Sequence, residues 1–434
     1  MDIHISEAKP DRWLQLMQSA VGCGPEQAAG YWMTAYSLKP SRPEPLYLLA
    51  KQFRCAGSNE ASMRLLDLAV PNKEEYEGRI EAAHSWGLAE EYLIVSFYCG
   101  KDGARDHMLT LMDGKGCPNS TVQGALSNYR FYGSHKLRST SIPDKISNQT
   151  RTLAAQNGAT VITYPSSPCI IKTPGAYLIN QRLVSYKLLD EGRYDLGASG
   201  TVTTFNERTE TPGDIEDDPS VVSVQLFSPP SLANLYNGLE DVKVWRKEDG
   251  ALVYLATHIS PNRDIRMSRG EYSKEGMSNP IVMEHVDHRG ETEKNWAQCG
   301  DDMVVYKWSP LTVCKIDGSQ ISPVVVNYNV PGSFQWMRGS TNACLYQGRL
   351  WFLTHSVLHR SPRVYYNHFV VLDPETFRVM SYSAPFKLSD HPIEFCLGLV
   401  VEEKRILIGY SEMDGSSKIA KVDWDEIIGL LVHL

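Results

Sequence analysis

A group of basic side chains follows an apolar run near residue 355. His355, His359, Arg360, Arg363 and His368 lie within fourteen residues of a chain whose formal net charge is −8. Arginine presents a planar fork of N–H donors that matches phosphate oxygens. The cluster therefore predicts a local anion site. The alternative is a solvated loop that contains a core histidine.

Acidic side chains recur in a second pattern, as the neighbours Glu240 and Asp241 and as the single residues Glu293 and Glu394. A carboxylic acid keeps its proton near neutral pH when burial or another carboxylate raises its pKa, as general acid catalysis requires. If these positions converge in space, they predict a site that protonates a leaving-group oxygen. The alternative is that Glu240 and Asp241 only cap or tie strands.

The elements that must position these residues are hairpins that recur along the chain. In each, a polar start precedes an apolar run, a tight turn and a second apolar run. Recurrence of a hairpin-sized unit at roughly 45–70 residues is typical of a β-propeller. We therefore expect a mainly β fold, a five-bladed propeller over residues 161–434. The five repeats cover residues 168–186, 240–258, 293–308, 338–355 and 394–411.

Residues 1–135 have the pattern of an α-helical domain. Large apolar residues, a small alanine and a closing proline recur at a spacing typical of tetratricopeptide helix pairs, and residues 86–100 predict one more helix, which Gly100 would end. The expected role is a cap, and contact with a partner protein is the alternative. Residues 136–160 are the predicted linker, with a helix-like stretch at 150–158. The acidic segment 207–220 predicts a solvated connection.

The composition is that of a soluble globular protein, with 42% hydrophobic and 22% charged residues. An acidic chain of this kind lacks the broad basic surface that nucleic acids require. The nine cysteines are odd in number, scattered and never spaced as Cys-x-x-Cys, which favours a reducing cytoplasm over disulfides or zinc. No signal peptide, apolar membrane span, metal site or cofactor motif is predicted.

Four of the repeats carry motifs that resemble glycoside hydrolase family 130, the β-mannoside phosphorylases and related mannosyltransferases. Residues 240–243 resemble its Glu-Asp-Pro-Arg motif, with Val242 and Lys243 in place of Pro-Arg. Residues 293–295 resemble its Asp/Glu-Lys-Asn motif, 354–355 its Tyr-His motif, and 409–414 its final Tyr-Tyr-Gly-Ala-x-Asp motif. The helical part also resembles the tetratricopeptide segments of bacterial glycosyltransferases.

This resemblance implies a general acid at Asp241. It also implies that Lys294 contacts phosphate, and Arg338 and His355 lie at the corresponding ends of the fourth repeat as further phosphate ligands. The basic cluster adds Arg363 to these predicted anion ligands. Tryptophans 296, 308 and 336 flank these charged positions and could stack on sugars, although core packing is the alternative for each. The predicted ligands of sugar hydroxyl groups are Arg182, Tyr186, Glu240, Asn295, Glu394 and Asp414.

The combined hypothesis is an enzyme that forms or cleaves a glycosidic bond with a phosphate-bearing donor or product. Its partners would be a sugar donor and a glycan acceptor. Glycosyl transfer is favoured because the helical segment resembles those of glycosyltransferases. The alternatives are a phosphorylase or hydrolase of the β-mannoside type, or a non-catalytic propeller that binds glycans or proteins.

Overall fold

The computed structural model describes residues 11–142, 149–155, 158–197, 200, 202–216, 221, 223–227, 238–259, 264–286 and 292–434. Contacts divide the chain into two compact units, Met1–His135 and Lys136–Leu434. Among the described residues, no helix is both long and apolar enough to cross a membrane.

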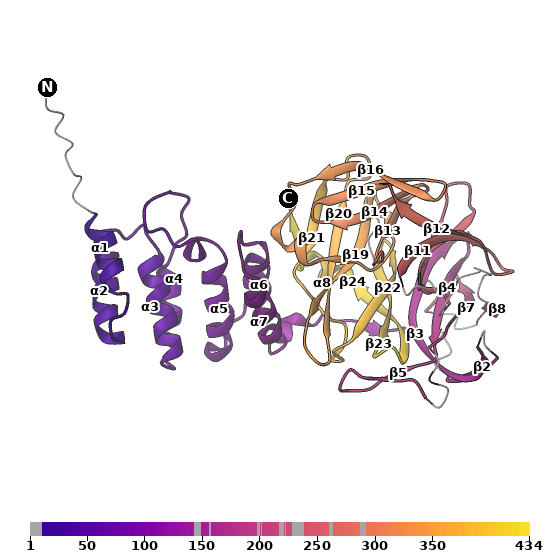
Figure 1. Ribbon diagram of the computed structural model, residues 1–434, viewed down its shortest axis with the longest axis horizontal. Helices are drawn as coiled ribbons and strands as arrows, with labels where there is room; N and C mark the ends of the chain where they lie inside the picture. The colour runs from indigo at the N-terminus through magenta and orange to yellow at the C-terminus, as the bar shows by residue number, and fades with distance from the viewer. Residues whose placement is uncertain are drawn as a thin grey trace, which may run out of the picture. The chain divides into compact units, whose positions relative to one another are not determined.

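The first unit is helical, and its consecutive helices lie side by side (Figure 1). The helix predicted from residues 86–100 is present as α5, and it ends because Gly100 adopts a left-handed backbone with φ 63°. Whether the helix pairs are tetratricopeptide repeats stays a prediction. The helices are α1 (Arg12–Ser19), α2 (Pro25–Leu38), α3 (Glu44–Cys55), α4 (Asn59–Leu68), α5 (Trp86–Cys99), α6 (Ala104–Asp113) and α7 (Asn119–Tyr129), with 3₁₀ turns η1 (Glu81–His84) and η2 (Gly133–His135).

The second unit consists almost entirely of strands. The first half of the unit contains β1 (Thr140–Ser141), β2 (Arg151–Ala154), β3 (Thr160–Thr173), β4 (Ala176–Val184), β5 (Lys187–Leu188), β6 (Tyr194–Asp195), β7 (Thr204–Pro212), β8 (Ser223–Phe227), β9 (Glu240–Arg246), β10 (Leu252–Ile259), β11 (Ile265–Tyr272) and β12 (Met277–His285). The second half contains β13 (Ala297–Gly300), β14 (Met303–Trp308), β15 (Leu311–Asp317), β16 (Gln320–Asn327), η3 (Gly332–Trp336), β17 (Arg338–Gly339), β18 (Cys344–Tyr346), β19 (Arg349–Leu358), β20 (Val364–Leu372), β21 (Val379–Ser383), β22 (Glu394–Val401), β23 (Arg405–Glu412), β24 (Ser416–Asp423), α8 (Trp424–Ile428) and β25 (Leu431–His433).

Antiparallel meanders form the sheets of this unit. The strand orders are β2-β3-β4-β7-β8, β17-β19-β20-β21-β25 and β1-β24-β23-β22, and an eight-stranded sheet joins the meanders β9–β12 and β13–β16 through a parallel β12/β16 pair. Each repeat predicted from the sequence contains an antiparallel pair: β3/β4, β9/β10, β13/β14, β18/β19 and β22/β23. These five pairings are confirmed, whereas the number of propeller blades stays a prediction.

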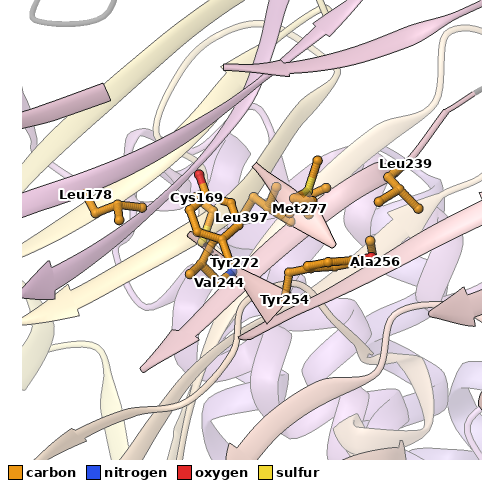
Figure 2. Packing of buried hydrophobic residues seen from close by; sticks show 10 residues of the cluster. Cys169, Leu178, Leu239, Val244, Tyr254, Ala256, Tyr272, Met277 and Leu397 are labelled. Atoms are coloured by element: carbon orange, nitrogen blue, oxygen red, sulfur yellow. Dashed lines mark hydrogen bonds between the residues drawn. The ribbon is translucent and has the colours of Figure 1, made fainter. Parts of the chain in front are cut away.

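Apolar residues fill the spaces between neighbouring meanders. One cluster includes Cys169 of β3, Val244 of β9, Tyr254 of β10 and Leu397 of β22 (Figure 2). Burial of such surface contributes about 25 cal/mol per Å². The meanders therefore share this part of their core, which holds their strands together.

Two expectations about the connections are wrong. Within the stretch 150–158, predicted to be helical, residues 151–154 form β2, because they pair with β3 from Arg151 opposite Thr163. The acidic segment 207–220 begins inside β7, where Glu207 is 1% exposed and pairs with Arg151 at 2.7 Å. Residues 217–220 lie outside the described residues. Long-range strand pairing overrides local composition in both places.

Candidate functional site

Four of the predicted site residues lie around a fifth, a buried arginine. Arg182, on β4, is 6% exposed. Its Nη1 donates to Asp241 Oδ1 at 2.9 Å, and its Nη2 lies 3.5 Å from Glu240 Oε2 and 3.4 Å from the Tyr186 hydroxyl. The Tyr186 hydroxyl donates in turn to Asp414 Oδ2 at 3.2 Å. We call this set the Arg182 cluster.

Local backbone irregularities present these acids. The β9/β10 register shifts between Glu240 and Lys243, so Asp241 lies in a β-bulge, with φ 50°. Asp414 lies in the turn between β23 and β24, with φ 49°. Asparagine and aspartate enter this left-handed region more readily than other residues with side chains, and functional sites are where such conformations collect.

A second bulge supports the cluster from β3. The β3/β4 register shifts between Pro165 and Pro168, where two residues of β3 have no paired residue on β4. Ser166 is one of these two residues. Its Oγ donates to Asp414 Oδ1 at 3.1 Å, so both oxygens of this carboxylate have protein donors. Sequence reasoning missed Ser166, because nothing in the local pattern Ser-Ser-Pro connects it to a residue near the other end of the chain.

The surroundings of Glu240 shift the pKa of its carboxyl group. Burial raises the pKa of Glu240, the Arg182 and Lys294 cations lower it, and the Asp241 and Asp414 carboxylates raise it further, with a net upward shift. Glu240 therefore holds a proton to a higher pH than an ordinary glutamate. The cluster thus combines a group suited to proton storage with a carboxylate, Asp241, that an arginine contacts directly.

The predicted anion ligands lie partly around a single cavity. Lys294, Asn295 and Arg338 line a cavity of about 580 Å³ at the start of β13 and β17. Asn295 has φ 64°. Its carbonyl oxygen lies against Gly339, where the Cβ of any other residue would overlap this oxygen. This close approach of the two segments explains why the lysine and the arginine share one cavity.

His355 borders these cations but carries no charge of its own at neutral pH. It is 3% exposed, and its Nδ1 lies 2.8 Å from Ser340 Oγ. Burial lowers its pKa to about 3, and the nearby Arg338 and Lys294 cations lower it further. Burial likewise lowers the pKa of His368 to about 4. The basic cluster in the sequence is therefore not a set of five positive charges.

Arg363 belongs to another part of the site. Burial raises the pKa of Tyr365, a hydrogen bond from Arg363 lowers it, and the Asp414 and Asp241 carboxylates raise it. The rings of Tyr365 and His355 are 5.5 Å apart. Arg363 thus lies on the side of the Arg182 cluster, whereas Arg338 and Lys294 share the cavity.

Glu394 differs from the other predicted sugar ligands. It is fully buried, and its carboxylate accepts hydrogen bonds from the Leu388 and Ser389 amides, the Ser389 hydroxyl and Asn367 Nδ2, with Lys387 Nζ at 3.5 Å. These partners engage both oxygens. Its contact with a sugar stays a prediction that nothing in this geometry supports.

The tryptophans singled out from the sequence are largely packed inside. Trp296 and Trp308 are 1% and 4% exposed, yet both line the 580 Å³ cavity. Trp296 Nε1 donates to Glu293 Oε2 at 3.2 Å. Lys243, which replaces the arginine of the resembled motif, is buried and donates to the Trp296 carbonyl oxygen. Lys243 thus links the acidic bulge to the segment that carries Lys294.

No protein-family model matches this sequence, and no curated protein matches it. Several solved structures are similar. A glycosyl hydrolase from Bacteroides ovatus is 12% identical, with a TM-score of 0.47, covering 67% of this chain and 95% of that chain. A beta-1,2-mannobiose phosphorylase from Listeria innocua is 10% identical, with a TM-score of 0.43 and coverages of 62% and 92%.

A mannose phosphorylase from Leishmania mexicana, in complex with phosphate ion, is 14% identical, with a TM-score of 0.35 and coverages of 61% and 85%. Identities and TM-scores this low do not place the chain in a family.

Proposed function

We propose that the second unit is a five-bladed propeller whose central site cleaves or forms a glycosidic bond with a phosphate-bearing co-substrate. The observation that carries this proposal is that the proton-holding carboxyl group of Glu240, in the Arg182 cluster, lies close enough to the cavity cation Lys294 for that charge to lower its pKa, and Arg338 lines the same cavity. Glycosidic cleavage needs a proton donor on the leaving oxygen. Phosphate needs fixed cationic donors.

Support for the five-bladed arrangement comes from a second cavity, of about 540 Å³. Each of the five repeats contributes a strand to its lining, and Leu350 of β19, Pro374 and the turn residues Lys247 and Glu248 also line it. Such convergence of separate meanders on one axis is what a propeller channel requires. The contributing strands are β3, β9, β13, β18 and β22.

Asp241 is the proposed catalytic residue, as the sequence predicts. Glu240 is the second candidate, because burial raises its pKa and a general acid must still hold its proton when substrate binds. Arg182, Tyr186, Asp414 and Asn295 would bind sugar hydroxyl groups.

We place phosphorolysis or hydrolysis of a β-mannoside-type bond ahead of glycosyl transfer. Glycosyl transfer is favoured only by the resemblance of the helical segment to those of glycosyltransferases. Every residue of the Arg182 cluster and of the 580 Å³ cavity belongs instead to the second unit, so the helical segment supplies none of the groups proposed for the reaction. Phosphorylases are also among the similar structures, although at their low identity the site's own groups must support the reaction.

The test is to incubate the protein with β-1,2-mannobiose in the presence and absence of orthophosphate and to measure mannose 1-phosphate and free mannose. Sugar phosphate identifies a phosphorylase, and free sugar without phosphate identifies a hydrolase. Asp241→Asn should lower the rate by roughly 10²–10⁴-fold. Asp249→Asn, in the exposed β9/β10 turn, is the matched control and should leave it unchanged.

Glu240→Gln decides between the two carboxyl groups. If Glu240 is the acid, its amide variant loses the alkaline limb of the pH profile and Asp241→Asn keeps it. A folded protein that turns over no mannoside, with or without phosphate, would overturn the enzyme assignment and leave a binding propeller.

A further inference from the structure

The 580 Å³ cavity is larger than a single phosphate ion requires. Cavities of roughly 300–1,000 Å³ hold ligands the size of a nucleotide or a drug. This one extends from the start of β13 across β14 to η3 and β17. We call it the Trp308 cavity, lined by Thr292, Glu293, Lys294, Asn295, Trp296, Tyr306, Lys307, Trp308, Ser309, Phe334, Gln335, Met337, Arg338 and Gly339.

Three cations line the Trp308 cavity: Lys294, Lys307 and Arg338. Within the described part of the chain, none of them forms an ion pair. The one carboxylate in the lining, Glu293, accepts hydrogen bonds from Trp296 Nε1 at 3.2 Å and from the Tyr306 hydroxyl at 3.1 Å. In a chain of net charge −8, three cations thus gather at one cavity without an ion pair to any described residue.

A fourth donor in the same lining is a buried indole. Trp308 is 4% exposed, and its Nε1 has no hydrogen-bond partner within the described residues. Its ring is fixed by edge contacts with Phe334 and Phe352, at centroid distances of 6.2 and 5.3 Å. Buried donors are almost always paired, and leaving one unpaired costs about 1–3 kcal/mol. Within the same described residues, the indole Nε1 atoms of Trp13, Trp336 and Trp351 are unpaired in the same way, so the missing partner alone does not identify a ligand. Trp308 Nε1 differs in lying beside Gly339, which also lines the cavity, so it is one more donor at the cation-lined wall.

We propose that the Trp308 cavity binds a diphosphate group, with Lys294 and Arg338 on the phosphoryl group nearest the Arg182 cluster and Lys307 and Trp308 Nε1 on the second. One phosphate dianion is balanced by two cations, and the arginine fork alone supplies two donors. A third cation and an unpaired N–H are in excess of that need. A second phosphoryl group uses both.

This inference rests on the proposed function and names its co-substrate. A diphosphate oxygen forms the new bond to the anomeric carbon, the bond from that carbon to the leaving oxygen breaks, and the acid of the Arg182 cluster gives that oxygen its proton. The products are a sugar linked to diphosphate and a free alcohol. Inorganic diphosphate and a nucleoside diphosphate share this chemistry. If the co-substrate is a nucleoside diphosphate, the reverse of this cleavage transfers the sugar from a nucleotide sugar to the alcohol, which is glycosyl transfer.

Isothermal titration calorimetry on the full chain tests the proposal without turnover. The probes are sodium orthophosphate, sodium diphosphate and a set of nucleoside diphosphates, all at one ionic strength and pH. Wild-type protein should bind diphosphate at least tenfold more tightly than orthophosphate. Lys307→Ala should weaken diphosphate binding about tenfold, the equivalent of one charge-assisted hydrogen bond, and orthophosphate binding less than twofold.

Lys315→Ala is the matched control, because Lys315 is an exposed lysine on the neighbouring strand β15 and does not line the cavity. It should change neither affinity. Trp308→Phe keeps the apolar ring and removes the N–H, so it should also weaken diphosphate selectively. Thermal unfolding of each variant confirms that it is folded.

Each outcome decides between the two proposals. Equal affinity for the two anions, or an unchanged diphosphate affinity in Lys307→Ala, overturns the diphosphate site and leaves orthophosphate at Lys294 and Arg338. If the protein binds neither orthophosphate nor diphosphate, both the diphosphate site and the phosphate part of the proposed function are overturned. If nucleoside diphosphates bind more tightly than inorganic diphosphate, the second phosphoryl group comes from a nucleotide.

Discussion

Replacing Arg182 by methionine should destabilise the second unit, because it leaves two half-buried carboxyl groups without their counter-charge. The side chain of Arg182 is 7% exposed and contacts Asp241 at 2.9 Å and Glu240 at 3.5 Å. Removing one partner of a buried ion pair typically costs 3–5 kcal/mol. The side chains of Asp241 and Glu240 are 25% and 21% exposed, so the expected loss at pH 7 is about 1–3 kcal/mol, between the values for exposed and buried pairs. Methionine keeps most of the volume, so this loss comes mainly from charge.

The loss should shrink as the pH falls. Burial already raises the pKa of Glu240 in the folded protein above its ordinary value of 4.5. A carboxyl group with a raised folded pKa stabilises the fold fully below its unfolded pKa, and that contribution is lost as the pH rises through the folded pKa. Without Arg182, which lowers it, the folded pKa of Glu240 rises further. The Arg182→Met variant should therefore recover stability relative to wild type between pH 7 and pH 5.

Urea unfolding at pH 7 and pH 5 measures both effects. Six of the nine tryptophans lie in residues 136–434, so tryptophan fluorescence reports mainly on the second unit, while far-ultraviolet circular dichroism follows the helices. Arg138→Met is the control, because Arg138 is 88% exposed and pairs with Glu426 at the surface. It should match wild type at both pH values.

A loss below about 1 kcal/mol for Arg182→Met, the range of surface pairs, would refute the view that this arginine balances buried charge. An equal loss at pH 5 and pH 7 would show that packing, and not charge, explains the effect.

Two further predictions follow from the same structure. Burial lowers the pKa of Lys243 in the folded protein to about 8. The contribution of Lys243 to stability is therefore complete above the pKa of an unfolded lysine and is lost as the pH falls through 8. The unfolding free energy of wild type should rise relative to that of Lys243→Met between pH 7 and pH 10. Gly409→Ala should lower the melting temperature by several degrees, because its Cβ would overlap the Pro168 carbonyl oxygen. Gly250→Ala, whose Cβ meets only an arginine tip at 3.7 Å, should cost about 1 kcal/mol from its φ of 87°. Equal effects of the two glycine substitutions would contradict the close packing at Gly409.

Helix and hairpin positions were largely readable from the sequence, because their signals are local. The helix at 86–99 has helical apolar spacing and a terminal glycine, and the repeats at 240–258 and 394–411 have β-branched runs on either side of a turn. Residues 151–154 have no such signal. They become a strand only because β3 offers an edge to pair with.

The candidate site was predictable by residue type and only partly by location. Asp241, Lys294 and Asp414 were selected from motifs, but the contact between Arg182 and the acidic pair depends on strands from separate meanders. Charge state was also beyond the sequence. His355 reads as a cation beside Arg360 and Arg363, yet burial lowers its pKa to about 3.

By itself, then, the sequence determined the helical and strand-rich parts, the five hairpins and most of the side chains that could do chemistry, since these depend on neighbours in the chain. Tertiary structure decided which of them meet. It gathered Arg182 with Asp414 and engaged Glu394 within the protein. Among the residues that the structure describes, it also left the Trp308 indole without a partner beside Lys307. The reason is physical: burial and pairing set charge, donor availability and distance, and both arise only when distant segments pack together.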